Sequence, residues 1–73
     1  REPVKLEEQK KFIFKHFDGD GKLKFSIILD KLETRMEIVV TFLAILDLVR
    51  DGSCKLIQEK VFGDLELQKI DFI

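Results

Sequence analysis

The residues that most resemble a chemical site lie between His16 and Leu23, where two aspartates alternate with two glycines. Counted from His16, the run has acids at positions 3 and 5 of a calcium-binding EF-hand loop and glycine at position 6. The ends do not fit. Position 1 would be His16 and position 12 would be Ile27, so the first carboxylate and the bidentate glutamate are both missing. We therefore expect a polar turn here and no calcium site.

Metal binding and nucleophilic catalysis both lack the residues they need. The chain has one histidine, His16, and one cysteine, Cys54, which are too few for the four nitrogen and sulfur ligands of a structural zinc site. Cys54 alternates with Leu56 in a strand-like pattern, which favours a buried structural thiol over a nucleophile. None of the four glycines is followed by the Gly-Lys-Ser/Thr sequence of a phosphate-binding loop. We therefore expect no cofactor and no enzymatic activity.

The composition predicts one small globular domain covering residues 1–73. Hydrophobic residues make up 45% of the chain and charged residues 37%, enough apolar material for a single core. The formal net charge is −1, so the chain lacks the positive field with which proteins bind the phosphate backbone. The single cysteine favours a reducing compartment, and no apolar run is long enough to span a membrane. Because the sequence starts at Arg1 and not at Met, we expect a fragment of a longer protein.

The first half of the chain predicts a helix, a strand and a second helix. Apolar residues at helical spacing define the first helix, and the turn residues at 18–21 end it. Ser26 is a suitable N-cap for the second helix. The expected elements cover residues 3–17, 22–25 and 26–33. The apolar face of the second helix consists of Ile28, Leu29 and Leu32.

The third helix, expected over residues 35–50, has the clearest start in the sequence. Thr34 and Glu37 have the spacing of a capping box, in which each side chain satisfies a backbone donor of the other residue. Gly52 is placed to end the helix. Its apolar residues cover about half of the circumference, more than a helix needs to face its own core; they are Ile38, Val39, Phe42, Leu43, Ile45, Leu46 and Val49. We expect the opposite side to hold Glu37, Thr41, Asp47 and Asp51.

Two alternating segments near the end of the chain predict a β-hairpin. They cover residues 54–57 and 65–68, with Gly63 and Asp64 as the expected turn. The order of the elements is then helix, strand, helix, helix, strand, strand. This order predicts an α+β fold, a small winged helix with three helices, a short strand and a C-terminal hairpin as its wing.

The third helix distinguishes two functions of winged helices. A DNA reader would offer Arg, Lys, Asn or Gln on the outer side of this helix. Here that side is expected to be apolar or acidic, which favours a protein-binding module. Acidic residues also offset Arg35 and Arg50 and extend onto the wing; they are Glu37, Asp47, Asp51, Asp64 and Glu66. Two alternatives stay open: a DNA-binding winged-helix module of a transcription regulator, and a domain that only dimerises.

The third helix and the hairpin carry a family resemblance. The stretch from Phe42 to Leu48, followed by Gly52, is similar to the Phe-Leu-Ala-Leu-Leu-Glu-Leu helix and glycine of the ScpA family of kleisins, the segregation and condensation proteins. Gln58-Glu59 and Phe62-Gly63-Asp64-Leu65 resemble the family's Gln-Glu-Glu-Pro-Phe-Gly-Asp-Ile hairpin at the same spacing. Two residues depart from it: Lys60 replaces a glutamate and Val61 replaces the proline.

The resemblance implies the C-terminal domain of a kleisin that binds the ATPase head of an SMC protein in a condensin-like complex. It also implies an accessory ScpB-type subunit bound by other parts of the protein, contact with DNA only through the complex, and a cytoplasmic location at the nucleoid. In the family an aromatic and an aliphatic residue one helical turn apart contact the head. By position these are Phe42 and Leu46. Val39 and Phe62 are further candidates for partner binding, with a place in the core as the alternative for Phe62.

Overall fold

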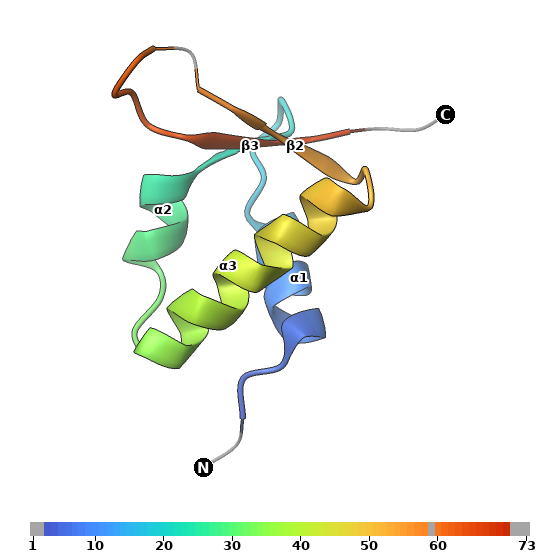
Figure 1. The fold of residues 1–73 in the computed structure, drawn as a ribbon, viewed down its shortest axis with the longest axis vertical. Coiled ribbons are helices and arrows are strands. Elements are labelled where there is room, and N and C mark those ends of the chain that lie inside the picture. The colour runs from blue at the N-terminus through green and yellow to red at the C-terminus, as the bar shows by residue number, and fades with distance from the viewer. Residues whose placement is uncertain (1–2, 59, 71–73) are drawn as a thin grey trace.

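The computed structural model describes residues 3–58 and 60–70. Arg1 and Glu59, on which two of the expectations rest, lie outside the described residues. The elements are α1 (Leu6–Lys15), β1 (Lys22–Lys24), α2 (Phe25–Asp30), α3 (Arg35–Arg50), β2 (Cys54–Ile57) and β3 (Glu66–Lys69). The helices lie on one side of the sheet, and the β2–β3 hairpin is the last of these elements in chain order (Figure 1). The predicted α+β winged-helix architecture is confirmed.

The three strands form one antiparallel sheet in the order β1-β3-β2. Leu67 of the central strand pairs with Leu23 of β1 on one side and with Leu56 of β2 on the other. Leu23 and Leu67 are buried, whereas Leu56 is exposed. The short strand before α2 therefore joins the hairpin, and the sheet ties the first half of the chain to the second.

The core lies between the sheet and the helices, and each element contributes to it. Its buried members are Ile13, Leu23, Ile28, Ala44, Ile45, Leu48, Cys54 and Leu67. The burial of Cys54 confirms the prediction of a structural thiol, and the same loss of solvation raises the pKa of that thiol. The most buried polar side chain is that of Thr41 on α3.

Helices α1 and α2 are shorter than the sequence pattern predicts, and the predicted capping role of Ser26 is wrong. No side chain caps the start of α2, which begins at Phe25. The Oγ atom of Ser26 donates instead to Oδ2 of Asp64, at 2.7 Å. The chain returning from the hairpin also accepts the backbone N–H of Phe25 at the carbonyl of Leu65, at 2.9 Å. Contacts distant in sequence thus replace the local cap.

Helix α3 has the predicted bounds because both of its ends are specified locally. The backbone N–H of Glu37 donates to Oγ1 of Thr34 at 3.1 Å, and the N–H of Thr34 donates to Oε1 of Glu37 at 2.9 Å, which completes the capping box. After the helix, Gly52 has a φ of 85°, a left-handed conformation that glycine adopts without steric cost.

The polar run at residues 18–21 is a turn, as predicted. The carboxylate of Asp18 accepts the backbone N–H groups of Asp20 at 2.8 Å and Lys22 at 2.9 Å. Hydrogen bonds to the charged form lower the pKa of Asp18, the bond from Lys22 most strongly. The first carboxylate after α1, that of Asp18, therefore binds the backbone of its own turn.

The turn of the hairpin differs from the expected Gly63-Asp64 turn. The backbone N–H of Gly63 donates to the carbonyl of Lys60 at 2.9 Å, so Val61 and Phe62 are the central residues. Phe62 has a φ of 65°, the left-handed conformation that turns such as type II require at their third position. A Cβ atom on Gly63 would lie 3.0 Å from the carbonyl oxygen of Lys60. Gly63 therefore lets the backbone pass close to Lys60 and does not itself occupy a central position of the turn.

Candidate protein-binding face

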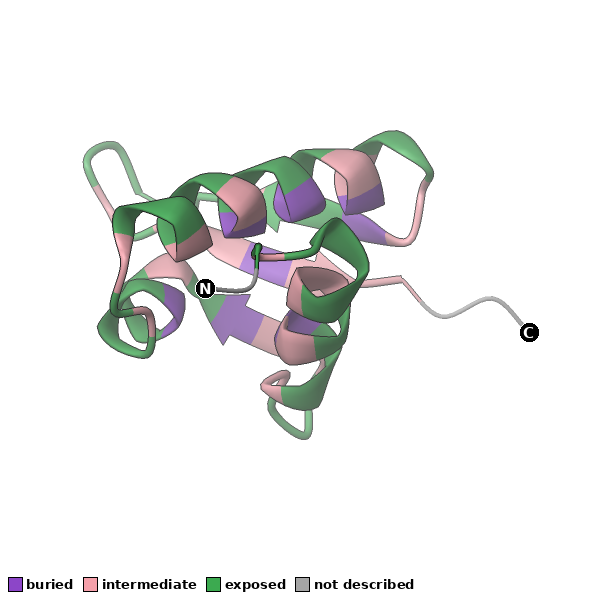
Figure 2. Cartoon of the chain, turned by 90° about the horizontal axis from the view of Figure 1, so that it is seen from below, coloured by how far each residue is buried: buried purple, intermediate pink, exposed green. Residues whose placement is uncertain are grey.

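Helix α3 buries one side and exposes the other. The buried residues are Thr41, Ala44, Ile45 and Leu48. The opposite side, which we call the outer face, consists of Met36, Val39, Phe42, Leu43 and Leu46, which are between 46 and 55% exposed. Figure 2 shows the exposed residues of this long helix along its outward side and the buried ones toward the rest of the molecule. The domain thus leaves a row of large apolar side chains uncovered.

The side of α3 opposite its apolar arc, where Thr41 and Asp47 were expected, contacts α1 and is not a free polar surface. Thr41 is buried, and its Oγ1 accepts a hydrogen bond from Nε2 of Gln9 at 2.7 Å. Asp47 is half-buried and is bound by Lys10. Helix α1 supplies both partners, so Thr41 and Asp47 face α1, whereas the apolar residues of the outer face point away from the core. A buried hydroxyl is tolerated there because it is hydrogen-bonded.

Asp47 connects α1 to the last turn of α3. Its Oδ2 accepts a short contact from Nζ of Lys10, and its Oδ1 lies 2.7 Å from Nη2 of Arg50. The hydrogen bond from Lys10, followed by that from Arg50, lowers the pKa of Asp47. The same bond to Asp47 raises the pKa of Lys10. Lys10 and Arg50 therefore both contact the carboxylate of Asp47, and Nζ of Lys10 also lies 3.5 Å from Oε2 of Glu7.

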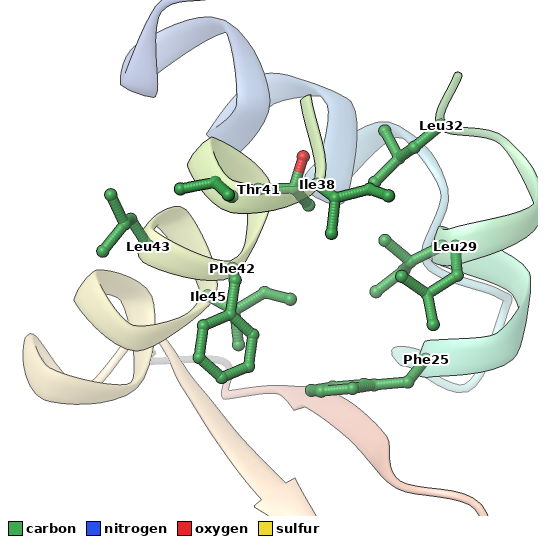
Figure 3. Close-up of a pocket in the computed structure, with 10 residues that line it drawn as sticks. Phe25, Leu29, Leu32, Ile38, Thr41, Phe42, Leu43 and Ile45 are labelled. Atoms are coloured by element: carbon green, nitrogen blue, oxygen red, sulfur yellow. The ribbon is translucent and has the colours of Figure 1, made fainter. Parts of the chain in front are cut away.

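An apolar groove of about 320 Å³ separates α2 from α3. Figure 3 shows Phe25 and Phe42 on either side of one end of this groove and Leu32 and Ile38 at the other. Leu29 also lines it and is 51% exposed, although it was expected on the same apolar face as the buried Ile28. The contribution of Leu29 and Phe25 to this surface was not predicted from the sequence. Their only signal was an apolar spacing that a core face would share.

A second groove runs along the other side of the outer face, between α3 and the chain that enters α1. It is lined by Val4, Leu6, Val40, Leu43, Leu46, Asp47 and Arg50. Leu43 lines both grooves. The outer face is therefore a ridge with an apolar groove on each side, a shape that suits a partner able to pack around it.

Comparison with known proteins identifies the family. The chain matches the family described as segregation and condensation protein ScpA over residues 4–70. It belongs to the ScpA family. It is 36% identical over 69 residues to segregation and condensation protein A of Halothermothrix orenii, covering 92% of this chain and 28% of the relative. It is 29% identical over 66 residues to that of Clostridium perfringens strain SM101, covering 90% of this chain and 27% of the relative.

The match covers only part of each relative. The chain spans little more than a quarter of the length of the curated ScpA proteins it resembles. The family description names segregation and condensation and no chemical reaction, which agrees with the expectation that the chain is not an enzyme. Within residues 3–58 and 60–70, no group of three or more His, Cys, Asp or Glu side chains is arranged to hold a metal ion. In the same part of the chain, no helix is long and apolar enough to cross a bilayer.

The candidate contacts transferred from the ScpA pattern fall in two places. Phe42 and Leu46 lie one turn apart on the outer face, 52% and 46% exposed, and Val39 lies beside them. Phe62 is fully exposed and lies in the β2–β3 connection, which Figure 1 places beyond the sheet on the side of α2. The structure thus brings three of the four residues together and leaves Phe62 apart. Their role in partner binding stays a prediction.

Proposed function

We propose that this chain is the C-terminal winged-helix domain of a ScpA-type kleisin and binds the ATPase head of an SMC protein in a condensin-like complex. The observation that supports this most directly is the outer face of α3, whose large apolar side chains are half exposed. Contiguous apolar surface of this kind is typical of interaction sites. In this proposal the domain is non-catalytic, and any ATP is bound by the partner.

Phe42 and Leu46 are the proposed anchors, with Val39 beside them. An aromatic side chain beside the α2–α3 groove and an aliphatic one beside the second groove occupy the two flanks of the ridge. Apolar anchors that enter a partner's pocket carry most of an interface's energy, at about 2 kcal/mol or more when truncated. Phe62 is proposed as a separate contact at the wing.

The test is Phe42→Arg in the 73-residue chain, mixed with its cognate SMC head. We expect binding by calorimetry to be lost while the thermal unfolding transition is kept, because half of the Phe42 side chain is already solvated. Phe14→Arg is the matched control, since Phe14 is also exposed but lies on α1. If Phe14→Arg abolished binding equally, or if Phe42→Arg unfolded the domain, the site would be wrongly assigned.

The same complex defines the other proposed partners. An accessory ScpB-type subunit would bind parts of the protein other than this domain, DNA would be contacted only through the assembled complex, and the protein would be cytoplasmic at the nucleoid. Size-exclusion chromatography separates this proposal from its alternatives. A shift only with the head supports head binding, a dimer of the chain alone supports the dimerisation alternative, and a shift with duplex DNA supports the transcription-regulator alternative.

A further inference from the structure

Two arginines lie at the ends of the outer face. At about 100° per residue, Arg35, Val39, Leu46 and Arg50 fall within one narrow stripe of α3, opposite its buried side. Both arginines are exposed. At the helical rise of about 1.5 Å per residue, roughly 22 Å of helix separate them. The apolar ridge therefore has a cation at each end.

The fold gives little reason for Arg35 and only a partial reason for Arg50, which lies in the last turn of α3 and pairs with Asp47. Arg35 makes no ion pair with any residue in the described part of the chain, and it occupies the first turn of α3, where the helix dipole disfavours positive charge. Arg50 uses one N–H group on Asp47, but its side chain is 83% exposed. A guanidinium has five N–H donors, so most of those of Arg50 face solvent.

Two carboxylates of α3 beside this stripe are engaged by other groups. Asp47, at its edge, is bound by Lys10 as well as by Arg50. Glu37 accepts the backbone N–H groups of Glu33 and Thr34 and so is directed toward the start of the helix. The outer face therefore presents an apolar centre and positive ends, although the chain as a whole carries a net charge of −1.

We infer that Arg35 and Arg50 form the charged ends of the α3 interface, and that the partner is a protein surface with an apolar patch bordered by a carboxylate at each end. This rests on the proposed function and adds the chemistry of the partner's surface. Duplex DNA fits less well, because a phosphate contact surface needs a run of cations, and the residues between the two arginines on this stripe are apolar.

Charges at the rim of an interface act mainly on the association rate and on its salt dependence. The test measures association of the 73-residue chain with its cognate SMC head by stopped-flow at about 0.1 M and about 1 M salt, where the screening length falls from roughly 10 to roughly 3 Å. We expect both Arg35→Glu and Arg50→Gln to slow association at the lower salt, Arg35→Glu by about three- to tenfold. At the higher salt we expect either variant to slow association by less than about twofold.

Lys55→Glu is the matched control for Arg35→Glu, because Lys55 is an exposed cation on β2 and the change in net charge is the same. A second readout excludes misfolding. Arg35→Glu removes a cation from the first turn of α3, so its thermal midpoint should equal or exceed that of the unchanged chain. Slower association of a domain that is no less stable supports the inference, because a structural role of Arg35 would lower both.

The outcomes separate this inference from the proposal beneath it. If the head binds, Phe42→Arg abolishes binding and Arg35→Glu changes nothing, the charged ends are wrong and the α3 site stands. Equal slowing by Lys55→Glu would also overturn the inference, since net charge alone would explain it. If the unchanged chain fails to bind the head but binds a labelled DNA duplex through Arg35, both proposals are wrong. If it binds neither the head nor the duplex, both proposals are also wrong.

Discussion

The inner side of α3 is buried although it contains the polar Thr41, whereas the outer side stays exposed although it carries Phe42 and Leu43. Hydrophobicity alone would have ordered the two sides the other way at these positions. The inner side also carries Ala44, Ile45 and Leu48, and Thr41 can be buried with them because Gln9 of α1 satisfies its hydroxyl. The outer side lacks a neighbouring element to cover it within the described part of the chain. When apolar residues cover much of a helix, the hydrogen-bond partners of its few polar residues help to decide which side is buried. Here those partners are Gln9 and Lys10 on α1.

The largest expected effect comes from truncating leucines on the two sides. Leu48→Ala removes a buried side chain and should cost about 2–5 kcal/mol of unfolding free energy, through lost burial and the cavity left behind. Leu46→Ala, two residues away and half exposed, should cost less than about 1 kcal/mol but weaken head binding. Urea unfolding and calorimetry measure the pair. Equal destabilisation by the two substitutions would remove the distinction between the sides.

The capping box offers the next effect, because it fixes where α3 begins and hence which residues face outward. Thr34→Ala deletes the acceptor for the N–H of Glu37 and should cost about 1 kcal/mol. Thr34→Ser keeps a hydroxyl and serves as the control. If hydrogen exchange in the first turn of α3 were the same in both variants, the box would not hold the start of the outer face.

Phe62 extends the comparison to the wing, where an exposed aromatic also lacks a covering element. Because Phe62 is fully exposed at a φ of 65°, Phe62→Gly relieves backbone strain and should stabilise the domain by about 0.5–1 kcal/mol. Val61→Gly, at the neighbouring turn position, should not stabilise it. A loss of head binding in the more stable Phe62→Gly protein would make the wing a second contact. Unchanged binding would restrict the interface to α3.

The smallest effect is the dependence of stability on pH at the α1–α3 boundary. Because the folded-state pKa of Asp47 is lowered, its stabilising contribution is complete above the unfolded-state value of about 3.9 and is lost as the pH falls through the folded pKa. Asp47→Asn should therefore flatten the acid limb of the stability curve, followed by urea unfolding from neutral to acidic pH. Lys10→Gln should flatten it too, and an unchanged acid limb would mean that the ion pair does not hold α1 against α3.

Local signals account for the parts of the fold that were predictable. The capping box at Thr34 and the left-handed Gly52 specify both ends of α3 within a few residues, and its bounds were predicted correctly. The role of Ser26 was missed because its partner, Asp64, is distant in the sequence. The pairing of β1 with β3 is also long-range. No periodicity within either strand encodes it.

The candidate site was predictable only as a helix, not as a face. An apolar arc covering half of α3 is compatible with several rotations of the helix about its axis. The observed rotation places Thr41 and Asp47 against Gln9 and Lys10 of α1. The exposure of Leu29 beside the α2–α3 groove is missed for the same reason. Which side of an element faces out depends on neighbours that a one-dimensional pattern does not contain.

The strand order has a consequence for how the molecule is made. The central strand, β3, is the last of the three in the chain, and its fully buried Leu67 lies between β1 and β2. Before β3 has left the ribosome, a nascent chain therefore has β1 and β2 without the strand that pairs with both, and its core lacks Leu67. We expect the helices to stay loosely ordered until β3 has left the ribosome, and the domain to acquire its structure in one cooperative step at that point.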